Sequence, residues 1–351
     1  MKSVTLTKPK EPAGRIEVRL PASKSISNRL LIMNHLSGGK IKGIGMSRAE
    51  DTILLTKALE AGEGVLDMGD AGTAIRFGLA WASITPGERV LTGSARLCQR
   101  PIRQLVEALQ SLGADIEYVE KQGFAPLRVR GKNLDGGTVN MDASVSSQFI
   151  SAMMLVAPYM AKGLKIDLSA KRVSKPYVYM TASLMRDAGA RVELGEDSIS
   201  IAPEKYREAT IHVEPDWTSA SYFYSAVALN EGLEVFMPGL IEENIQGDSI
   251  LSDVYTGFGV ETVFQDGGAL LKRSGSPDSQ YRERDFTRVP DIAQTVAVTA
   301  AALEKEFTLT GLDTLRFKET DRIWALSSQL VKCGVHSRSL IQALTLEGHT
   351  P

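Results

Sequence analysis

The sequence lacks the features that mark secreted, metal-dependent and membrane proteins. Its 351 residues include two cysteines, Cys98 and Cys333, which are too few for a disulfide framework. Four dispersed histidines and no cluster of Cys and His argue against a structural metal site. The chain has no run of about 18 apolar residues, and its first residues show no apolar signal-peptide core. We therefore expect a soluble cytoplasmic protein without a metal ion or a membrane segment.

An excess of positive charge is absent too. Lys and Arg number 40 against 42 Asp and Glu, so the formal net charge is −2. Nucleic-acid-binding proteins usually carry an excess of basic residues, so this class is not expected. The cations that matter must act locally, on a small anion. The length and the 43% hydrophobic content suffice for two domains, or one large one, with an ample core.

The most informative segment is Leu20–Arg29, between a strand-like run and an apolar helix-like run. It places two cations, Lys24 and Arg29, among three serines at a strand-to-helix turn. The free N–H groups and the dipole at a helix start favour an anion, and the two cations add to this preference. Ser25 or Ser27 is equally consistent with a plain N-cap. With both cations in one turn, we predict an anion site here.

The chain repeats one pattern, in which a Ser/Thr/Asp-rich turn opens an apolar helix of small residues. The five turns begin at Ser25, Asp70, Ser144, Asp216 and Pro290. In most units an amphipathic second helix follows, and a strand-like run begins after its closing Gly. The predicted second helices are Ala49–Gly62, Pro101–Gly113, Pro176–Gly189, Gly247–Gly259 and Lys318–Gly334.

Hairpins are expected within Val4–Leu20 and between Leu127–Gly131 and Gly137–Met141. The pattern therefore predicts an α/β protein of five units, each with strands, two helices and a hairpin, the first unit being shortened. The fifth unit ends within Leu344–Pro351, whereas two symmetric three-unit domains would need a sixth. Repetition of this kind implies no function by itself.

Eight motifs together resemble one family, the 5-enolpyruvylshikimate-3-phosphate (EPSP) synthases of the shikimate pathway. They are LPASKSISNR, DAGTAIR, QRPIRQLVEAL, SVSSQFISA, SKPYVYMT, SASYF, PDIAQT and KETDR. The resemblance implies a two-domain enolpyruvyl-transferase fold, an inside-out α/β barrel of βαβαββ repeats, here with the last repeat missing. The implied domains are residues 20–213 and residues 1–19 plus 214–351, with crossovers and a hinge near Leu20 and Asp216.

The resemblance also implies the reaction. The family joins phosphoenolpyruvate to the 5-hydroxyl of shikimate 3-phosphate and releases phosphate through a tetrahedral ketal phosphate, in aromatic amino acid biosynthesis. Such chemistry needs a base, an acid and several cations for one carboxylate and two phosphates. The two substrates are the implied partners. No cofactor, nucleic acid or membrane is implied, and the chain is expected to be a monomer.

Site residues follow from the resemblance position by position. The residues expected to bind shikimate 3-phosphate are Lys24, Ser25, Arg29, Ser146, Ser147, Gln148, Ser174, Tyr177, Asp291 and Lys318. Those expected to bind phosphoenolpyruvate are Lys24, Gly72, Arg100, Gln148 and Arg322. Gly72 would let phosphoenolpyruvate approach its backbone closely. Arg76 is consistent with a structural role beside that loop, and Lys175 with a solvated one.

Three residues are expected to act in catalysis. Asp291 would take the hydroxyl proton, Glu319 would protonate the methylene carbon, and Lys24 would contact both substrates. Lys318 and Arg322 are spaced i, i+4, so a shared helix face is predicted for them. Read alone, the KETDR segment is more typical of an ordinary solvated helix with internal ion pairs, and Asp321 fits that structural role better than a catalytic one.

Two departures from the family pattern matter. Thr314 stands near the place of a substrate-binding Asn, and it offers a shorter hydrogen-bonding group. A late His-Arg pair and lysine that hold phosphoenolpyruvate in the family have no counterpart before Pro351. A truncated chain with weak or absent turnover is therefore expected, since each lost charged hydrogen bond costs about 1.5–3 kcal/mol.

Two alternatives remain open. A non-catalytic protein that binds shikimate 3-phosphate would fit the missing unit. The sister transferase that acts on UDP-N-acetylglucosamine has the same fold, but it carries a cysteine five residues before its Arg-Pro. That position is Ala95 here, and Cys98 lies two residues before Arg100.

Overall fold

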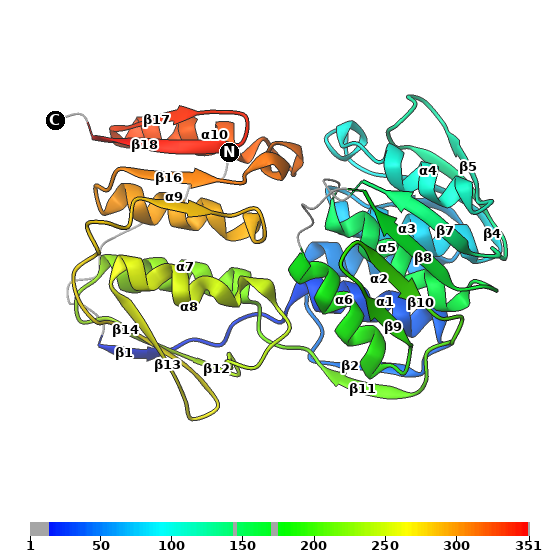
Figure 1. The fold of residues 1–351 in the computed structure, drawn as a ribbon, viewed down its shortest axis with the longest axis horizontal. Coiled ribbons are helices and arrows are strands. Elements are labelled where there is room, and N and C mark those ends of the chain that lie inside the picture. The colour runs from blue at the N-terminus through cyan, green and yellow to red at the C-terminus, as the bar shows by residue number, and fades with distance from the viewer. Residues whose placement is uncertain (1–13, 143–145, 170–174, 350–351) are drawn as a thin grey trace.

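The computed structural model describes residues 14–142, 146–169 and 175–349. The chain has an α/β architecture in which helices pack together on the inside and small sheets lie outside them (Figure 1). Two separate hydrophobic clusters form the core. One runs from Ile26 to Tyr206 and the other from Trp217 to Leu346. We call described residues 20–213 the first half, and residues 14–19 and 214–349 the second half.

Three sheets belong to the first half. The strands of the first, a parallel pair, are β2 (Ile41–Ile44) and β11 (Ala209–His212). The second has the order β3 (Gly64–Asp67), β4 (Gly87–Thr92), β6 (Leu127–Gly131), β5 (Asp115–Tyr118). The third has the order β7 (Gly137–Met141), β8 (Leu164–Leu168), β10 (Ser198–Ile201), β9 (Val192–Leu194).

Two sheets belong to the second half. One has the order β1 (Arg15–Glu17), β12 (Glu234–Pro238), β14 (Gly268–Arg273), β13 (Val260–Gln265). The other has the order β15 (Glu283–Asp285), β16 (Phe307–Thr310), β18 (Ala343–His349), β17 (Val335–Ser339). In the part of the chain that the structure describes, no sheet closes on itself.

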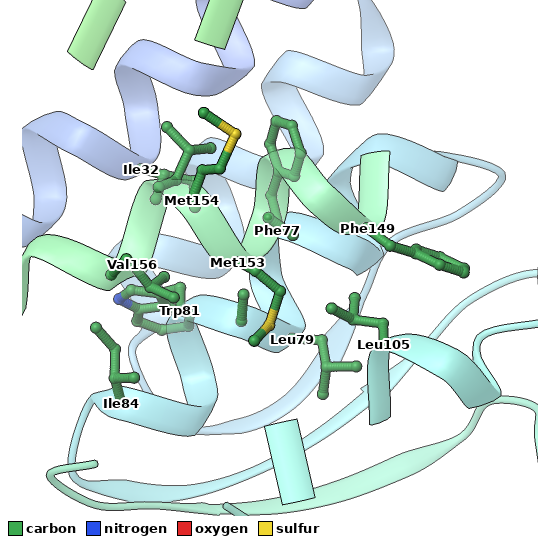
Figure 2. Packing of buried hydrophobic residues seen from close by; sticks show 14 of the residues in the cluster. Ile32, Phe77, Leu79, Trp81, Ile84, Leu105, Phe149, Met153, Met154 and Val156 are labelled. Carbon is green, nitrogen blue, oxygen red and sulfur yellow. The ribbon is translucent and has the colours of Figure 1, made fainter. Parts of the chain in front are cut away.

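The five turns predicted from the repeat do open helices. These inner helices are α1 (Lys24–Leu36), α3 (Gly72–Ile84), α5 (Ser147–Val156), α7 (Trp217–Leu229) and α9 (Ala293–Ala302), the last preceded by the 3-10 turn η5 (Pro290–Ile292). Side chains of α1, α3 and α5, among them Ile32, Phe77, Trp81, Met153 and Met154, meet in one packed layer (Figure 2). Helices that are apolar on all sides are expected to lie inside a core.

The second helices flank the inner helices of their own half. They are α2 (Glu50–Ala61), α4 (Arg103–Ser111), α6 (Lys175–Asp187), α8 (Leu251–Val254) and α10 (Arg322–Leu330). Of these, α2, α4 and α6 pack beside α1, α3 and α5, while α8 and α10 pack beside α7 and α9. Short 3-10 turns are η1 (Leu97–Gln99), η2 (Ala157–Tyr159), η3 (Gly247–Ile250), η4 (Tyr255–Phe258), η6 (Asp313–Phe317) and η7 (Val331–Cys333). No helix among the described residues is both long and apolar enough to span a bilayer.

The chain passes between the halves at two adjacent segments. The Ser23 amide donates to the Glu214 carbonyl at 2.8 Å, and the Asp216 amide donates to the Pro21 carbonyl at 2.8 Å. The first described strand, β1, pairs in parallel with β12 of the second half. The two crossings therefore lie side by side, at the starts of α1 and α7.

Three sequence predictions need correction. The segments 127–131 and 137–141 form no hairpin, because β6 pairs with β4 and β5 while β7 joins β8 in another sheet. The predicted helix over 247–259 breaks into η3, α8 and η4. The predicted helix over 318–334 begins four residues later, at Arg322, and ends at Leu330. The predicted hairpin within 4–20 lies largely outside the described residues.

Candidate active site

The first helix start carries the anion-site cations. The Ser23 side chain caps α1 by accepting from the Ile26 amide at 3.5 Å. Lys24, the first helical residue, donates from Nζ to Asp51 Oδ1 of α2 at 3.0 Å. Burial lowers the pKa of Lys24, but the charges of Asp51, Asp291 and Glu319 outweigh it, so the pKa is raised. The ammonium is therefore bonded to a carboxylate of the first half and is also stabilised by the charges of Asp291 and Glu319 in the second half.

Arg29 is buried, with 2% of its surface exposed. Its guanidinium donates to Thr181 Oγ1 at 2.7 Å, to the Ser25 carbonyl at 2.7 Å, to Ser151 Oγ at 3.2 Å and to the Tyr177 carbonyl at 3.4 Å. Burial lowers its pKa to about 10. Within residues 14–142, 146–169 and 175–349 no carboxylate pairs with it. Arg29 is thus a buried cation with neutral partners.

The second helix start, at Gly72, approaches two more arginines. A Cβ at Gly72 would lie 2.5 Å from guanidinium nitrogens of both Arg76 and Arg100. Arg76 Nη1 donates to the Gly72 carbonyl at 2.8 Å, and Arg100 Nη1 donates to the Asp70 carbonyl at 3.3 Å. Burial, and then the charge of Arg100, lower the pKa of Arg76 to about 9. This loop therefore concentrates positive charge around backbone that carries no side chain.

The third helix start adds polar groups. Ser146 caps α5 by accepting from the Gln148 amide at 3.4 Å, and Ser147 is the first helical residue. Gln148 Nε2 reaches the first turn of α3 and donates to Thr73 Oγ1 at 3.1 Å. The predicted site residue Ser174 lies outside the described residues, and Lys175 beside it is exposed.

Asp291 joins the two halves. Its carboxylate accepts from the Tyr177 hydroxyl at 3.0 Å, from Lys318 Nζ at 2.9 Å and from Arg322 Nη1 at 3.0 Å. Burial alone would raise the pKa of Asp291. The positive charges of Lys318 and Arg322 outweigh that effect, so the pKa lies well below its usual range. Burial raises the pKa of Tyr177 well above its usual value. The pair is therefore a carboxylate and a neutral phenol.

Glu319 lies on the same network. It accepts from Arg322 Nη2 at 2.8 Å, and its other oxygen lies 3.6 Å from Arg100 Nη1. Burial raises the pKa of Glu319, but its own backbone N–H and the two guanidinium groups lower it more. Its side chain remains 43% exposed. Without ligands it is a carboxylate within reach of solvent.

The segment that carries Lys318, Glu319 and Arg322 is not the helix predicted from the sequence. Lys318 is extended, with φ −82° and ψ −166°, and ends η6, whereas Arg322 opens α10. Asp321 caps α10 by accepting from the Trp324 amide at 3.0 Å, which agrees with its structural reading. Lys318 and Arg322 therefore share no helix face and meet only through Asp291. Thr314 Oγ1 is buried, without a hydrogen-bond partner among the described residues.

Sequence reasoning missed several groups at this site. Asp51 pairs with Lys24, while Ser151 and Thr181 bind Arg29. Asp248 of η3 is buried and accepts from the Thr218 hydroxyl. Burial and the charge of Asp291 raise its pKa to about 7. A local signal was available only for Asp51, which stands in the first turn of a predicted helix.

The polar network contains no evident metal centre. No group of three His, Cys, Asp or Glu side chains in the described part of the chain is placed to hold an ion. The groups that the structure brings together here are the cations Lys24, Arg29, Arg100, Lys318 and Arg322 and the carboxylates of Asp51, Asp248, Asp291 and Glu319.

Comparisons with known proteins place this arrangement in context. The matching family model is EPSP synthase (3-phosphoshikimate 1-carboxyvinyltransferase), over residues 55–349. A 3-phosphoshikimate 1-carboxyvinyltransferase of Bacteroides fragilis is 43% identical over 318 residues, covering 90% of this chain and 77% of the relative. One from Aliivibrio fischeri is 33% identical and covers 95% of this chain and 84% of the relative.

A solved EPSP synthase from Acinetobacter baumannii has the same fold. It superposes with a TM-score of 0.74 at 21% identity, covering 97% of this chain and 83% of that one. None of these matches supports the UDP-N-acetylglucosamine alternative, the non-catalytic alternative or the truncated, weakly active form.

Proposed function

Because the chain belongs to the EPSP synthase family, we propose that it transfers the enolpyruvyl group of phosphoenolpyruvate to the 5-hydroxyl of shikimate 3-phosphate. The observation that carries this proposal is the position of Asp291. Its carboxylate is held ionised by Lys318, Arg322 and Tyr177, where the two halves meet. Tyr177 connects Asp291 to Arg29, because its carbonyl accepts from that buried guanidinium, whose partners are neutral. A site for two anionic substrates requires such cations.

Shikimate 3-phosphate is proposed to bind at the helix starts of the first half. Arg29 supplies a buried charge, and Lys24 an ammonium whose charge interacts with carboxylates of both halves. N–H groups at the starts of α1 and α5 suit a phosphate. The remaining groups proposed to bind this substrate are Ser25, Ser146, Ser147, Gln148, Ser174, Tyr177, Asp291 and Lys318.

Phosphoenolpyruvate is proposed to bind over the Gly72 loop. Arg100 and Arg322 flank Glu319, while Gln148 reaches the same turn through Thr73. The missing Cβ of Gly72 leaves its backbone open to a carboxylate or phosphate oxygen. Lys24 is the last of the proposed phosphoenolpyruvate-binding residues, since its charge interacts with both Asp291 and Glu319.

In the proposed reaction one carboxyl group, Asp291, accepts a proton, and the other, Glu319, donates one. The 5-hydroxyl oxygen adds to C2 of phosphoenolpyruvate, its proton passes to Asp291, and C3 takes a proton from Glu319. The resulting ketal phosphate then loses phosphate and a methyl proton to give the enol ether. Glu319 must first be protonated. An anionic substrate that occupies Arg100 and Arg322 removes the charges that lower its pKa, and so favours the protonated form.

The finer architecture belongs to this proposal as well. We propose an inside-out barrel arrangement with domains at residues 20–213 and at residues 1–19 plus 214–351. The two hydrophobic clusters and the adjacent crossings support this division. A monomer in the cytoplasm is proposed too, and the two cysteines, which form no disulfide with each other, agree with a reducing compartment.

Single-turnover phosphate release tests the function. Enzyme in excess is mixed with phosphoenolpyruvate, shikimate 3-phosphate or both, and inorganic phosphate and product mass are followed. The proposal predicts release only with both substrates, and a product that carries the added enolpyruvyl group. UDP-N-acetylglucosamine replaces shikimate 3-phosphate as a control. Release with that acceptor, or failure to bind shikimate 3-phosphate, would contradict the proposal.

A further inference from the structure

A loop of the first half reaches across to the segment that carries the second-half site residues. This loop, residues 93–100, is anchored to the Gly72 loop. The Ser94 amide donates to the Gly69 carbonyl at 2.9 Å, and the Ser94 hydroxyl donates to the Asp70 carboxylate. The same hydroxyl accepts from the Leu97 amide at 3.1 Å, at the start of η1. These hydrogen bonds hold the loop against the proposed phosphoenolpyruvate site.

Arg96 projects from this loop to the backbone of the second half. Its Nε and Nη2 donate to the Lys318 carbonyl at 3.2 and 3.0 Å, and Nη2 also donates to the Arg316 carbonyl at 3.2 Å. Arg100 Nε adds a bond to the Phe317 carbonyl at 2.9 Å. Three consecutive carbonyls are thus bound by two guanidinium groups from the other half.

These carbonyls lie where the 3-10 turn η6 ends, and the backbone that follows has no regular structure before α10. Lys318 is extended, and residues 318–320 form bends between η6 and α10. Within the second half, Arg316 holds the segment to the β17–β18 turn, donating to the Leu340 carbonyl at 2.7 Å and the Ile341 carbonyl at 3.2 Å. The position of Lys318 and Glu319 is therefore set jointly by their own half and by Arg96.

We propose that Arg96 is a positioning residue, which locks residues 316–318 and so aims Lys318 and Glu319 at phosphoenolpyruvate once the halves are together. This inference rests on the proposed function. It assigns Arg96 no contact with substrate. The acceptors of Arg96 are two separate carbonyls, so binding both depends on the planar fork of the guanidinium group as well as on its charge. A lysine ammonium at this position would supply the charge without the fork.

Four proteins test the proposal: the unsubstituted chain, Arg96→Lys, Arg96→Gln and the control Arg103→Gln. Arg103 is exposed, opens α4 and lies seven residues further along, so its loss matches the change in net charge. For each protein, calorimetry gives the Kd of shikimate 3-phosphate alone and that of phosphoenolpyruvate with shikimate 3-phosphate at saturation. Hydrogen exchange of residues 313–324, followed by mass spectrometry, reports the order of the segment without ligands.

Both Arg96 variants should weaken phosphoenolpyruvate binding about tenfold, the effect of one charge-assisted hydrogen bond, and leave shikimate 3-phosphate binding within about twofold. Exchange in residues 313–324 should quicken in both, and Arg103→Gln should match the unsubstituted chain. An Arg96→Lys variant that binds phosphoenolpyruvate normally would overturn the proposal, since charge would then suffice. Equal weakening of both substrates would also overturn it, because the role would be general stability.

The outcome remains separable from that of the proposed function. If the unsubstituted chain binds neither substrate, or no phosphoenolpyruvate, the proposed function fails. The exchange data then decide about Arg96 alone. Unchanged exchange in both Arg96 variants would overturn the positioning role, and faster exchange confined to residues 313–324 would support it.

Discussion

The two sides of the proposed site carry their charge in opposite ways. In the first half, Arg29 and Arg76 are buried among hydroxyls, carbonyls and aromatic rings, and burial lowers both pKa values. In the second half, Lys318 and Arg322 are paired with Asp291, and Arg322 also with Glu319. One side has surplus positive charge, and the other is neutralised internally.

This difference suggests a division of labour. A buried guanidinium without a counter-ion costs stability, and an arriving phosphate offsets that cost. The first half should therefore provide most of the affinity for shikimate 3-phosphate. The second half holds carboxylates whose protons move, and its cations keep these carboxylates ionised until a substrate competes for them. Asp248 is a further acid of the second half, and neither Lys318 nor Arg322 forms an ion pair with it.

The largest effect is expected from Asp291→Asn. The loss of the proposed base should slow single-turnover phosphate release about 10²–10⁴-fold, while shikimate 3-phosphate still binds through the first half. Rapid-quench assays measure the rate of phosphate release, and calorimetry measures shikimate 3-phosphate binding. The control is Asp187→Asn, at an exposed residue that ends α6. A release rate within tenfold of the unsubstituted chain would show that Asp291 is not the base.

The surplus acid of the second half predicts a pH effect on stability. The pKa of Asp248 is about 7 in the folded chain against a reference value of 3.8. Between these values the unfolded chain loses a proton that the folded chain keeps, so this group lowers stability as pH rises from about 4 to 7. Its contribution then stays constant at higher pH, and amounts to at most about 4 kcal/mol.

Asp248→Asn should remove this dependence. Asparagine does not titrate and still accepts from Thr218, so the variant should gain stability relative to the unsubstituted chain as pH rises. Urea unfolding of both proteins at pH 4.5 and pH 8 measures the difference, in which other titrating groups largely cancel. A difference that is the same at both pH values would mean that Asp248 is ionised in the folded chain.

A smaller, selective effect is expected from Gly72→Ala. The new Cβ would lie 2.5 Å from the guanidinium nitrogens of Arg76 and Arg100, which must move away from the loop. Phosphoenolpyruvate binding should weaken about tenfold, with shikimate 3-phosphate binding unchanged. Gly275→Ala is the control, because nothing lies within 4 Å of its added Cβ. Parallel losses for both substrates would argue against a loop that serves one of them.

The sequence predicted the helix starts well, because their signals are local. Ser23, Ser146 and Asp216 each cap the helix that follows, through a bond to an amide two or three residues on. The cap of α1 is therefore Ser23, whereas the sequence had suggested Ser25 or Ser27, which both lie inside the helix. The same rule explains the error at residues 318–322. The spacing of Lys318 and Arg322 suggested one helix, but the capping signal of Asp321 places the helix start at Arg322.

Contacts between distant segments were beyond the sequence. Thr181 lies 152 residues from Arg29, and Lys318 lies 222 residues from Arg96. No periodicity or cap encodes such a pairing, because it depends on how whole helices pack. The 127–141 region failed for the same reason. Both predicted strands form, but β6 pairs with β4 in one sheet and β7 pairs with β8 in another.

The most direct test of this division of labour titrates shikimate 3-phosphate, without phosphoenolpyruvate, into the unsubstituted chain, Arg29→Met and Arg322→Met. Thermal melts confirm that each variant is folded. Arg29→Met should bind at least about tenfold more weakly, whereas Arg322→Met should stay within about threefold of the unsubstituted chain. Equal losses, or a greater loss in Arg322→Met, would contradict the claim that the unpaired cations of the first half bind this substrate.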